Sequence, residues 1–350
     1  MPALHRLPLA ARRSFRLALT ATLALTTAYG LAIPLPFIAP LMAVVLGATA
    51  QPPPGAKQSF VLLLILTLMF SVGVLLGPLL QYAPVSALLL IGLGLYVSSQ
   101  LAIVGGKDAP ATLLALGLTA IPAASTVSQA LASALIIALV VGTALAIASL
   151  WLAYLLFPED PQPQNAPVPA AAATEDGHWR SLRATLVILP AFLLTLSNPA
   201  AYLPVTVKSI LLGREASDVK LRGAAREMIG STAFGGVCAI ALWMCLSLAV
   251  QLWFFAVWTL LFALLIAARA YGAHASRLGP GFWVNTLTTM LILLGSAVQD
   301  SANGKDVYQA FIVRMALFLL VAVYAVFALS LLEWWRQRRM SRRFKESRPC

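Results

Sequence analysis

Three charged residues near the last apolar run of the chain could pair with one another: Asp300, Asp306 and Arg314. Arg314 lies a few residues inside that run, and an arginine at the centre of a bilayer costs roughly 2.5–3.5 kcal/mol on insertion scales. Asp306 and Arg314 have a spacing that suits one face of a helix. The pattern predicts either an ion pair that gates an outer opening or a solvated loop that caps a helix. Both interpretations are open at this point.

A second group of polar residues lies on a short, proline-interrupted apolar segment, "SNPAAYLPVTVKSILLG", with Asn198, Tyr202, Thr206 and Lys208. Broken apolar segments free backbone groups that a ligand-lined cavity can satisfy, so these four residues are candidates for a substrate path. In that interpretation Lys208 binds an anionic substrate. The alternative is a lysine whose long stem snorkels to the cytoplasmic interface.

Two further polar residues flank one predicted inward loop. Arg269 lies in "LIAARAYG" and Asn285 in "FWVNTL". We include both as candidates for the substrate path. The alternative is that both lie at the membrane interface and touch no substrate.

The sequence lacks the motifs that are typical of several kinds of enzyme and metal site. The chain contains no G-x-x-x-x-G-K-[ST] phosphate loop, no His and Cys cluster with metal-ligand spacing, and no nucleophile motif around its three histidines. The acidic residues lie in loops or at the ends of apolar segments, so no buried carboxylate relay for protons is visible. We predict a protein that is not an enzyme and that has no metal and no cofactor.

The composition is that of a membrane protein. Hydrophobic residues make up 60% of the 350 residues and charged residues 10%, with a mean hydropathy of +0.88, whereas soluble domains carry about a quarter of charged residues. The net charge of +12 arises from Lys and Arg in the gaps between apolar runs. There it indicates orientation in the membrane and not a nucleic-acid partner.

The apolar segments suggest the architecture. A spanning helix needs about 20 apolar residues, and the sequence contains twelve apolar segments, of which the second and eighth are short and contain prolines. They lie at about 15–33, 37–50, 60–80, 85–104, 109–125, 130–157, 182–197, 200–212, 228–250, 252–268, 282–298 and 308–332.

A stretch rich in Pro, Ala and acidic residues divides six segments from six, and similar basic motifs, "RRSFR" and "RSLR", open the two halves. Because each half has an even number of segments, the two copies enter the membrane in the same sense. We predict an all-α polytopic membrane protein of about twelve segments in two parallel six-helix repeats. The boundaries are 1–157 for the first repeat, 158–181 for a cytoplasmic linker, 182–335 for the second repeat and 336–350 for a basic cytoplasmic tail.

The distribution of Lys and Arg predicts that both termini are cytoplasmic. In that orientation nearly all positive charges face the cytoplasm, and only Lys305 and Arg314 lie on the outer side. The N-terminal stretch has the charged and apolar regions of a secretory signal peptide. Its long apolar run without a clear cleavage site predicts a first spanning helix instead.

Two stretches resemble a known family. In "LRGAAREMIGSTAFGGVCAIAL" a basic loop runs into a Gly-rich segment, and "PFIAPLMAVVLGATAQPPPGAKQSF" adds a proline-marked segment with its following loop. With these stretches the chain resembles the fusaric acid resistance (FUSC) family of aromatic acid exporters, in a looser form of the family's Arg-x-x-Gly-Thr pattern and without its large cytoplasmic domain. The residues that carry the pattern are Arg226, Gly230, Thr232, Gly235 and Gly236.

The resemblance implies efflux of small organic anions, aromatic carboxylates above all, across a bacterial inner membrane. It also implies a periplasmic membrane fusion protein and an outer-membrane channel as partners, beside the membrane lipid. Plant anion channels of the malate type are distantly similar. The alternatives are therefore an anion channel, and a non-transporting membrane subunit that scaffolds a fusion-protein assembly.

Overall fold

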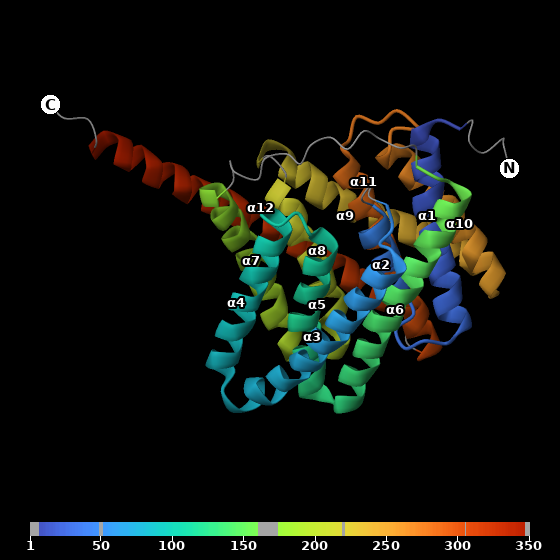
Figure 1. Cartoon of the computed structure of the whole chain (residues 1–350), viewed down its shortest axis with the longest axis horizontal. Helices are drawn as coiled ribbons and strands as arrows, with labels where there is room; N and C mark the ends of the chain where they lie inside the picture. Colours follow the sequence, from blue (N-terminus) through green and yellow to red (C-terminus); the bar gives the residue numbers. More distant parts are fainter. Residues whose placement is uncertain (1–6, 49–51, 160–173, 219–220, 305, 347–350) are drawn as a thin grey trace.

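A computed structural model gives the fold and describes residues 7–48, 52–159, 174–218, 221–304 and 306–346. Within these ranges every regular element is an α-helix, and no strand occurs. The helices pack into one bundle (Figure 1). Their bounds are α1 Leu9–Gly30, α2 Ile38–Gly47, α3 Ala56–Tyr82, α4 Pro84–Ile103, α5 Asp108–Val127, α6 Gln129–Leu156, α7 Thr174–Ser197, α8 Pro199–Asp218, α9 Leu221–Leu246, α10 Leu252–Ala270, α11 Pro280–Ala302 and α12 Val307–Glu346.

Nine helices in the described ranges are long and apolar enough to cross a membrane. This confirms the prediction of an all-helical chain with many segments of spanning length. The other three are α1, α2 and α8. The first turns of α1 carry three arginines, α2 has only 10 residues, and the apolar stretch of α8 among the described residues is Tyr202–Leu212.

Each predicted apolar segment falls on one helix, including the two short segments. The helices continue where the sequence turns polar. The last residues of the predicted 158–181 linker form the first turns of α7, and the predicted tail from residue 336 continues α12 to Glu346. Linker residues 160–173 lie outside the described residues. The C-terminal part of α12 projects from the bundle (Figure 1).

Prolines and a capping serine set several helix boundaries. Pro84 and Pro280 lie in the first turns of α4 and α11, where the fixed φ of proline suits the helix and its missing N–H is not needed. Ser128 caps α6, because its hydroxyl accepts a hydrogen bond from the backbone N–H of Leu131 at 3.1 Å. These signals explain the short connections before α4 and α6.

The connection between α1 and α2 has an unusual backbone. Ala32 and Leu35 have positive φ angles of 50° and 51°, a left-handed conformation that costs a residue with a Cβ about 1–2 kcal/mol. Pro34 and Pro36 restrict the same segment. The chain therefore re-enters the bundle as irregular backbone, with Phe37 buried, before α2 begins.

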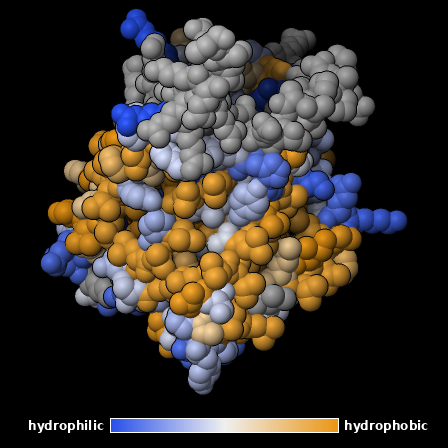
Figure 2. Space-filling model, turned by 90° about the vertical axis from the view of Figure 1, so that its left-hand side faces the viewer, coloured by the Kyte–Doolittle hydropathy of each residue, from blue (hydrophilic) through white to orange (hydrophobic). Residues whose placement is uncertain are grey.

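Helix α11 is the most buried spanning helix in the described ranges: 83% of its apolar window is buried, against 24% for α3. It contacts α9, α10 and α12, and also α2 and α8, the two helices that carry the proline-interrupted apolar segments. Helices such as α3 and α4 instead expose large apolar side chains, and Figure 2 shows hydrophobic side chains over much of the described surface on one side of the bundle. Such surfaces suit contact with lipid.

Arginines of α1 bind the segment that follows α6. Arg13 and Arg16 both form ion pairs with Glu159, and Nη1 of Arg12 donates to the backbone carbonyl of Pro158 at 2.9 Å. Burial alone would raise the pKa of Glu159, but the hydrogen bonds and charges of the two arginines outweigh burial and hold this pKa below its ordinary value. The contacts fasten the start of the linker to α1.

Tyr271, directly after α10, ties α10 to α2. Its hydroxyl donates hydrogen bonds to the backbone carbonyls of Gly47 at 3.2 Å and Ala48 at 3.0 Å. Burial raises the pKa of Tyr271 to about 12, so the hydroxyl stays protonated at neutral pH. A helix of the second half thereby holds the end of a helix of the first half.

We expect Glu159→Gln to destabilise the protein at neutral pH by about 1.5–3 kcal/mol, the range for hydrogen bonds to charged groups. Because the pKa of Glu159 is lower in the folded chain, its stabilisation is present above the ordinary pKa of about 4.3 and is lost as the pH falls through the folded value. Thermal unfolding in detergent between neutral and strongly acidic pH measures this. The two proteins should converge at the acid end, and Glu159→Asp should fall between them. Equal midpoints at neutral pH contradict the prediction.

Candidate functional site

A cavity of about 870 Å³ lies among α2, α5, α6, α8, α11 and α12. Its walls come from both halves of the chain. It lies toward the end of the bundle at which α11 ends and α12 begins, and α1 begins at the opposite end (Figure 1). The volume is within the range of small-molecule sites, about 300–1,000 Å³.

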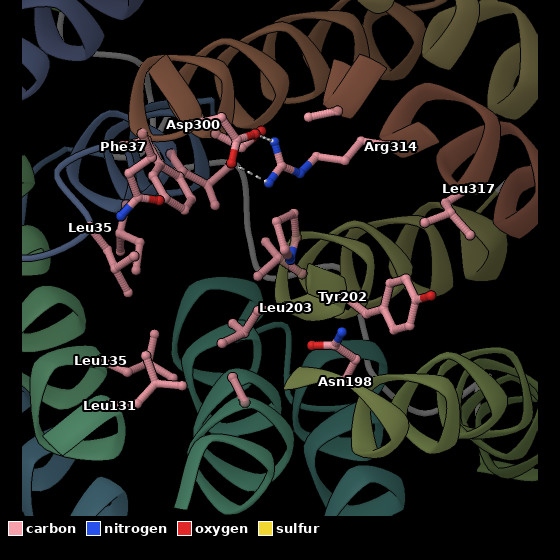
Figure 3. Close-up of a pocket in the computed structure, with 18 of the residues that line it drawn as sticks. Leu35, Phe37, Leu131, Leu135, Asn198, Tyr202, Leu203, Asp300, Arg314 and Leu317 are labelled. Carbon is pink, nitrogen blue, oxygen red and sulfur yellow. Dashed lines mark hydrogen bonds and ion pairs between the residues drawn. The ribbon is translucent and has the colours of Figure 1, made fainter. Parts of the chain in front are cut away.

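The cavity has one apolar wall and one mixed wall. The apolar wall, from α2 with its preceding loop, α5 and α6, consists of Leu35, Phe37, Ile38, Leu41, Met42, Leu116, Ala120, Leu131, Leu135 and Leu139. The mixed wall comes from the α7–α8 connection, α8, α11, the α11–α12 loop and α12. Its polar residues are Asn198, Tyr202, Ser296, Gln299, Asp300, Asn303, Asp306, Gln309 and Arg314, and its apolar residues are Leu203, Pro204, Val207, Ala310, Val313 and Leu317. Figure 3 shows Leu131 and Leu135 on one side of the space and Asn198 and Tyr202 on the other. This arrangement suits a ligand with an apolar body and a polar group.

Arg314 and Asp300 form an ion pair in the polar wall (Figure 3). The guanidinium donates through Nη1 to Oδ2 of Asp300 and through Nη2 to Oδ1, the second contact at 3.2 Å. This two-pronged geometry makes arginine–carboxylate pairs strong. Asp300 is 3% exposed, so the pair is largely desolvated. The guanidinium of Arg314 therefore meets a buried carboxylate on one side and the cavity on the other.

Asp306 has different partners. Its Oδ1 accepts hydrogen bonds from the backbone N–H groups of Tyr308 at 3.0 Å and Gln309 at 3.3 Å, so Asp306 caps the first turn of α12. Each of the two aspartates thus takes one of the two roles considered from the sequence, an ion pair or a helix cap. Asp300 pairs with Arg314, and Asp306 caps a helix at the edge of the cavity.

Lys208 lies in the interior, fully buried. Its ammonium donates to Oδ1 of Asn285 and, at 2.6 Å, to Oγ1 of Thr289. The amide nitrogen of Asn285 donates in turn to Oγ of Ser231 at 2.5 Å. We call these four residues, from α8, α9 and α11, the lysine cluster. The snorkelling alternative for Lys208 was wrong, because its ammonium is held among buried polar side chains and does not reach the interface.

A row of polar residues on α11 leads from the lysine cluster to the cavity. Asn285, Thr289, Ser296, Asp300 and Asn303 follow one another at spacings of three, four or seven residues, which places them on one face of the helix. The last three line the cavity and the first two belong to the lysine cluster. At 1.5 Å per residue, Thr289 lies about 10 Å along the helix axis from Ser296.

The remaining sequence candidates lie elsewhere. Asn198 and Tyr202 line the cavity, but Thr206 is buried against Thr195 of α7, with which its hydroxyl forms a hydrogen bond. The guanidinium of Arg269 stacks over the ring of Trp283, 5.1 Å from its centroid. Thr206 and Arg269 are therefore not part of the cavity wall.

Several residues of the site were not predicted from the sequence. The side-chain amides of Gln299, Asn303 and Gln309 line the cavity, and Ser231 and Thr289 complete the lysine cluster. The spacing of polar residues along α11 was the signal that could have found part of this set. The apolar wall gave no such signal, because its leucines resemble those of any membrane helix.

Comparison with known proteins assigns no activity to this geometry. A family model described as "Protein of unknown function (DUF2955)" matches residues 13–153. A search of curated proteins found no match. Within the described ranges, no group of three or more His, Cys, Asp or Glu residues is placed to hold a metal ion.

We expect Arg314→Ala to lower stability by about 3 kcal/mol, because it leaves the buried Asp300 carboxylate without its counter-charge. Adding Asp300→Ala should restore part of the loss, since the uncompensated charge is then gone. Asp306→Ala combined with Arg314→Ala serves as the matched control, and its effects should add, because Asp306 has other partners. Unfolding midpoints of the purified variants in detergent measure the coupling. Additive losses for Arg314 and Asp300 contradict the prediction.

Proposed function

We propose that this chain is a transporter that exports small organic anions, aromatic carboxylates above all. The observation that carries the proposal is an amphipathic cavity between the two halves, with a buried lysine held by residues of the same helix, α11, that lines the cavity further along. Ionisable groups inside membrane proteins commonly mark substrate paths. The cavity offers room for the apolar body of the anion, and Lys208 offers a positive charge deeper in the membrane.

The proposed architecture is two parallel six-helix repeats that cross the membrane twelve times. Helix packing supports it, because α1 packs on α2 and α6 as α7 packs on α8 and α12. Likewise α3 packs on α5 as α9 packs on α11, and α5 packs on α8 as α11 packs on α2. Each contact thus recurs when every helix is replaced by the one that is six places away in the chain. The family match also covers the stretch from α1 to α6 and stops before the linker.

A site between repeats is where transporters of this kind place their substrates. Helix α2 and helix α8 occupy corresponding positions in the two halves, each carries one of the two proline-interrupted apolar segments, and both line the cavity. We propose that an anion enters from the cytoplasm, approaches Lys208, and passes along the polar face of α11 to the cavity. Thr289 and Ser296 supply hydrogen-bonding groups along that route.

The charge of the cavity wall favours release. Asp300 and Asp306 contribute −2 and Arg314 contributes +1, so the Asp and Arg side chains that line it sum to −1. An anion is therefore held less tightly there than beside Lys208. An interior-negative potential supplies about 2.3 kcal/mol per charge per 100 mV, roughly a fifty-fold bias. Export could proceed on that bias without proton coupling.

We further propose that the protein lies in a bacterial inner membrane with both termini in the cytoplasm, so that the cavity faces the periplasm. The distribution of Lys and Arg along the chain supports this orientation. By the resemblance to FUSC exporters, a membrane fusion protein and an outer-membrane channel would receive the anion on that side.

Cysteine labelling tests the orientation. In a variant without native cysteines, Ala302→Cys and Ala275→Cys introduce exposed thiols near opposite ends of α11. A membrane-impermeant maleimide added to intact cells should label the first and spare the second, because the 303–306 connection faces outward in the proposed topology. Both should react after permeabilisation. Labelling of Ala275→Cys alone in intact cells contradicts the orientation.

Export is tested by the accumulation of radiolabelled benzoate in cells. Cells with the protein should retain less benzoate than cells without it, and Lys208→Met should bring retention back toward the level without the protein, because methionine fills the space but carries no charge. Lys57→Met, at an exposed lysine of the first half, is the matched control and should export normally. Immunoblots confirm equal abundance in the membrane. Normal export by Lys208→Met would remove Lys208 from the path.

A further inference from the structure

We propose that Arg314 binds the carboxylate of the substrate in the cavity and that Asp300 is a built-in competitor that occupies Arg314 between substrates. The inference deepens the proposed export of organic anions and rests on it. It identifies the cavity as a carboxylate subsite with a specific anchor, separate from the lysine cluster.

The first argument is the geometry of the pair. The guanidinium of Arg314 presents two donors to the two oxygens of Asp300, and a substrate carboxylate would offer the same two oxygens at the same spacing. Asp300 thus shows how a carboxylate sits on this arginine. Exchange of one carboxylate for another keeps both hydrogen bonds of the guanidinium.

The second argument is exposure. The side chain of Arg314 is 15% exposed and that of Asp300 is 4% exposed, and both line the cavity. The more accessible member of the pair is therefore the cation. The side-chain amides of Gln299 and Asn303 line the same wall, and they can donate hydrogen bonds to the Asp300 carboxylate once it is displaced.

The surroundings of the pair define the ligand class. Leu35, Phe37 and Leu317 line the same cavity as the pair, and Figure 3 shows Leu35 and Phe37 on the Asp300 side and Leu317 on the Arg314 side. These apolar side chains suit a ring or a short hydrocarbon body next to the carboxylate. Arg314 is the only Lys or Arg that lines the described cavity, and the Asp306 carboxylate shares its wall. The site therefore suits monocarboxylates and disfavours dicarboxylates, since a second negative charge finds no cation there.

Binding of radiolabelled benzoate to the purified full chain in nanodiscs tests the inference. Asp300→Asn removes the competing charge and should raise benzoate affinity about tenfold or more, because hydrogen bonds between charged groups are worth at least that ratio. Asp306→Asn is the matched control. It removes the same charge from the same cavity and leaves the pair intact, and asparagine caps helices as well as aspartate does. Its gain should be no more than about twofold, since Asp306 is exposed and its charge is screened by solvent and salt.

A double variant covers the case in which Asp300→Asn alone fails to fold. Arg314→Gln together with Asp300→Asn replaces the ion pair by two neutral amides of similar size. Its affinity for benzoate should be about tenfold or more lower than that of the natural chain, since the charge-assisted contact is gone. Phthalate, with two carboxylates, should compete with benzoate less well than unlabelled benzoate does. Undiminished binding by the double variant overturns the inference.

The outcomes separate this inference from the proposed function. Equal benzoate affinities for Asp300→Asn and Asp306→Asn overturn the role of Asp300, whatever the cells export. The accumulation of benzoate in cells decides export independently. Cells that export benzoate while Arg314 proves dispensable for binding would retain the proposed function without this carboxylate subsite.

Discussion

A charge buried among apolar helices is stable only when polar groups of the protein replace the water it has lost. Two cations in this bundle meet that condition on α11, the most buried spanning helix in the described ranges. Lys208 finds the amide of Asn285 and the hydroxyl of Thr289, and Arg314 finds the carboxylate of Asp300. One face of one helix thus supplies partners at two depths. Helix α11 contacts both α2 and α8, and its Asp300 lines the cavity.

The two halves pack alike but differ in chemistry. Lys208 lies on α8, and the corresponding region of α2 contains Val44, which is also fully buried. Similarly, the apolar wall of the cavity comes from α2, α5 and α6, whereas the charged groups come from the second half. A duplicated framework of helices would explain the repeated packing. On the proposed repeat, divergence of side chains between the two halves gives the cavity its two unlike walls.

The positions of the helices could be predicted from the sequence because each lipid-facing or buried segment must be apolar over a length fixed by the bilayer. The partners of individual residues could not. Whether Arg314 pairs with Asp300 or Asp306 depends on the turn between α11 and α12, and both aspartates lie close to it in sequence. Whether Lys208 snorkels depends on which helices surround α8, a tertiary property that the spacing within one segment does not contain. The role of Phe37 was hidden for the same reason, since it reaches the cavity through an irregular loop.

Costly local features gather around the cavity. A buried ion pair is weak evidence for stability, because apolar residues of similar volume often serve a fold equally well. The left-handed backbone at Leu35, a residue that lines the cavity, is likewise unfavourable for a side chain with a Cβ. A fold does not need such features for its stability. When several of them lie at one place, they indicate a function there. The Asp300–Arg314 pair and the Leu35 backbone come from different halves of the chain and meet at the same cavity. Both features therefore indicate this cavity as the functional part of the molecule.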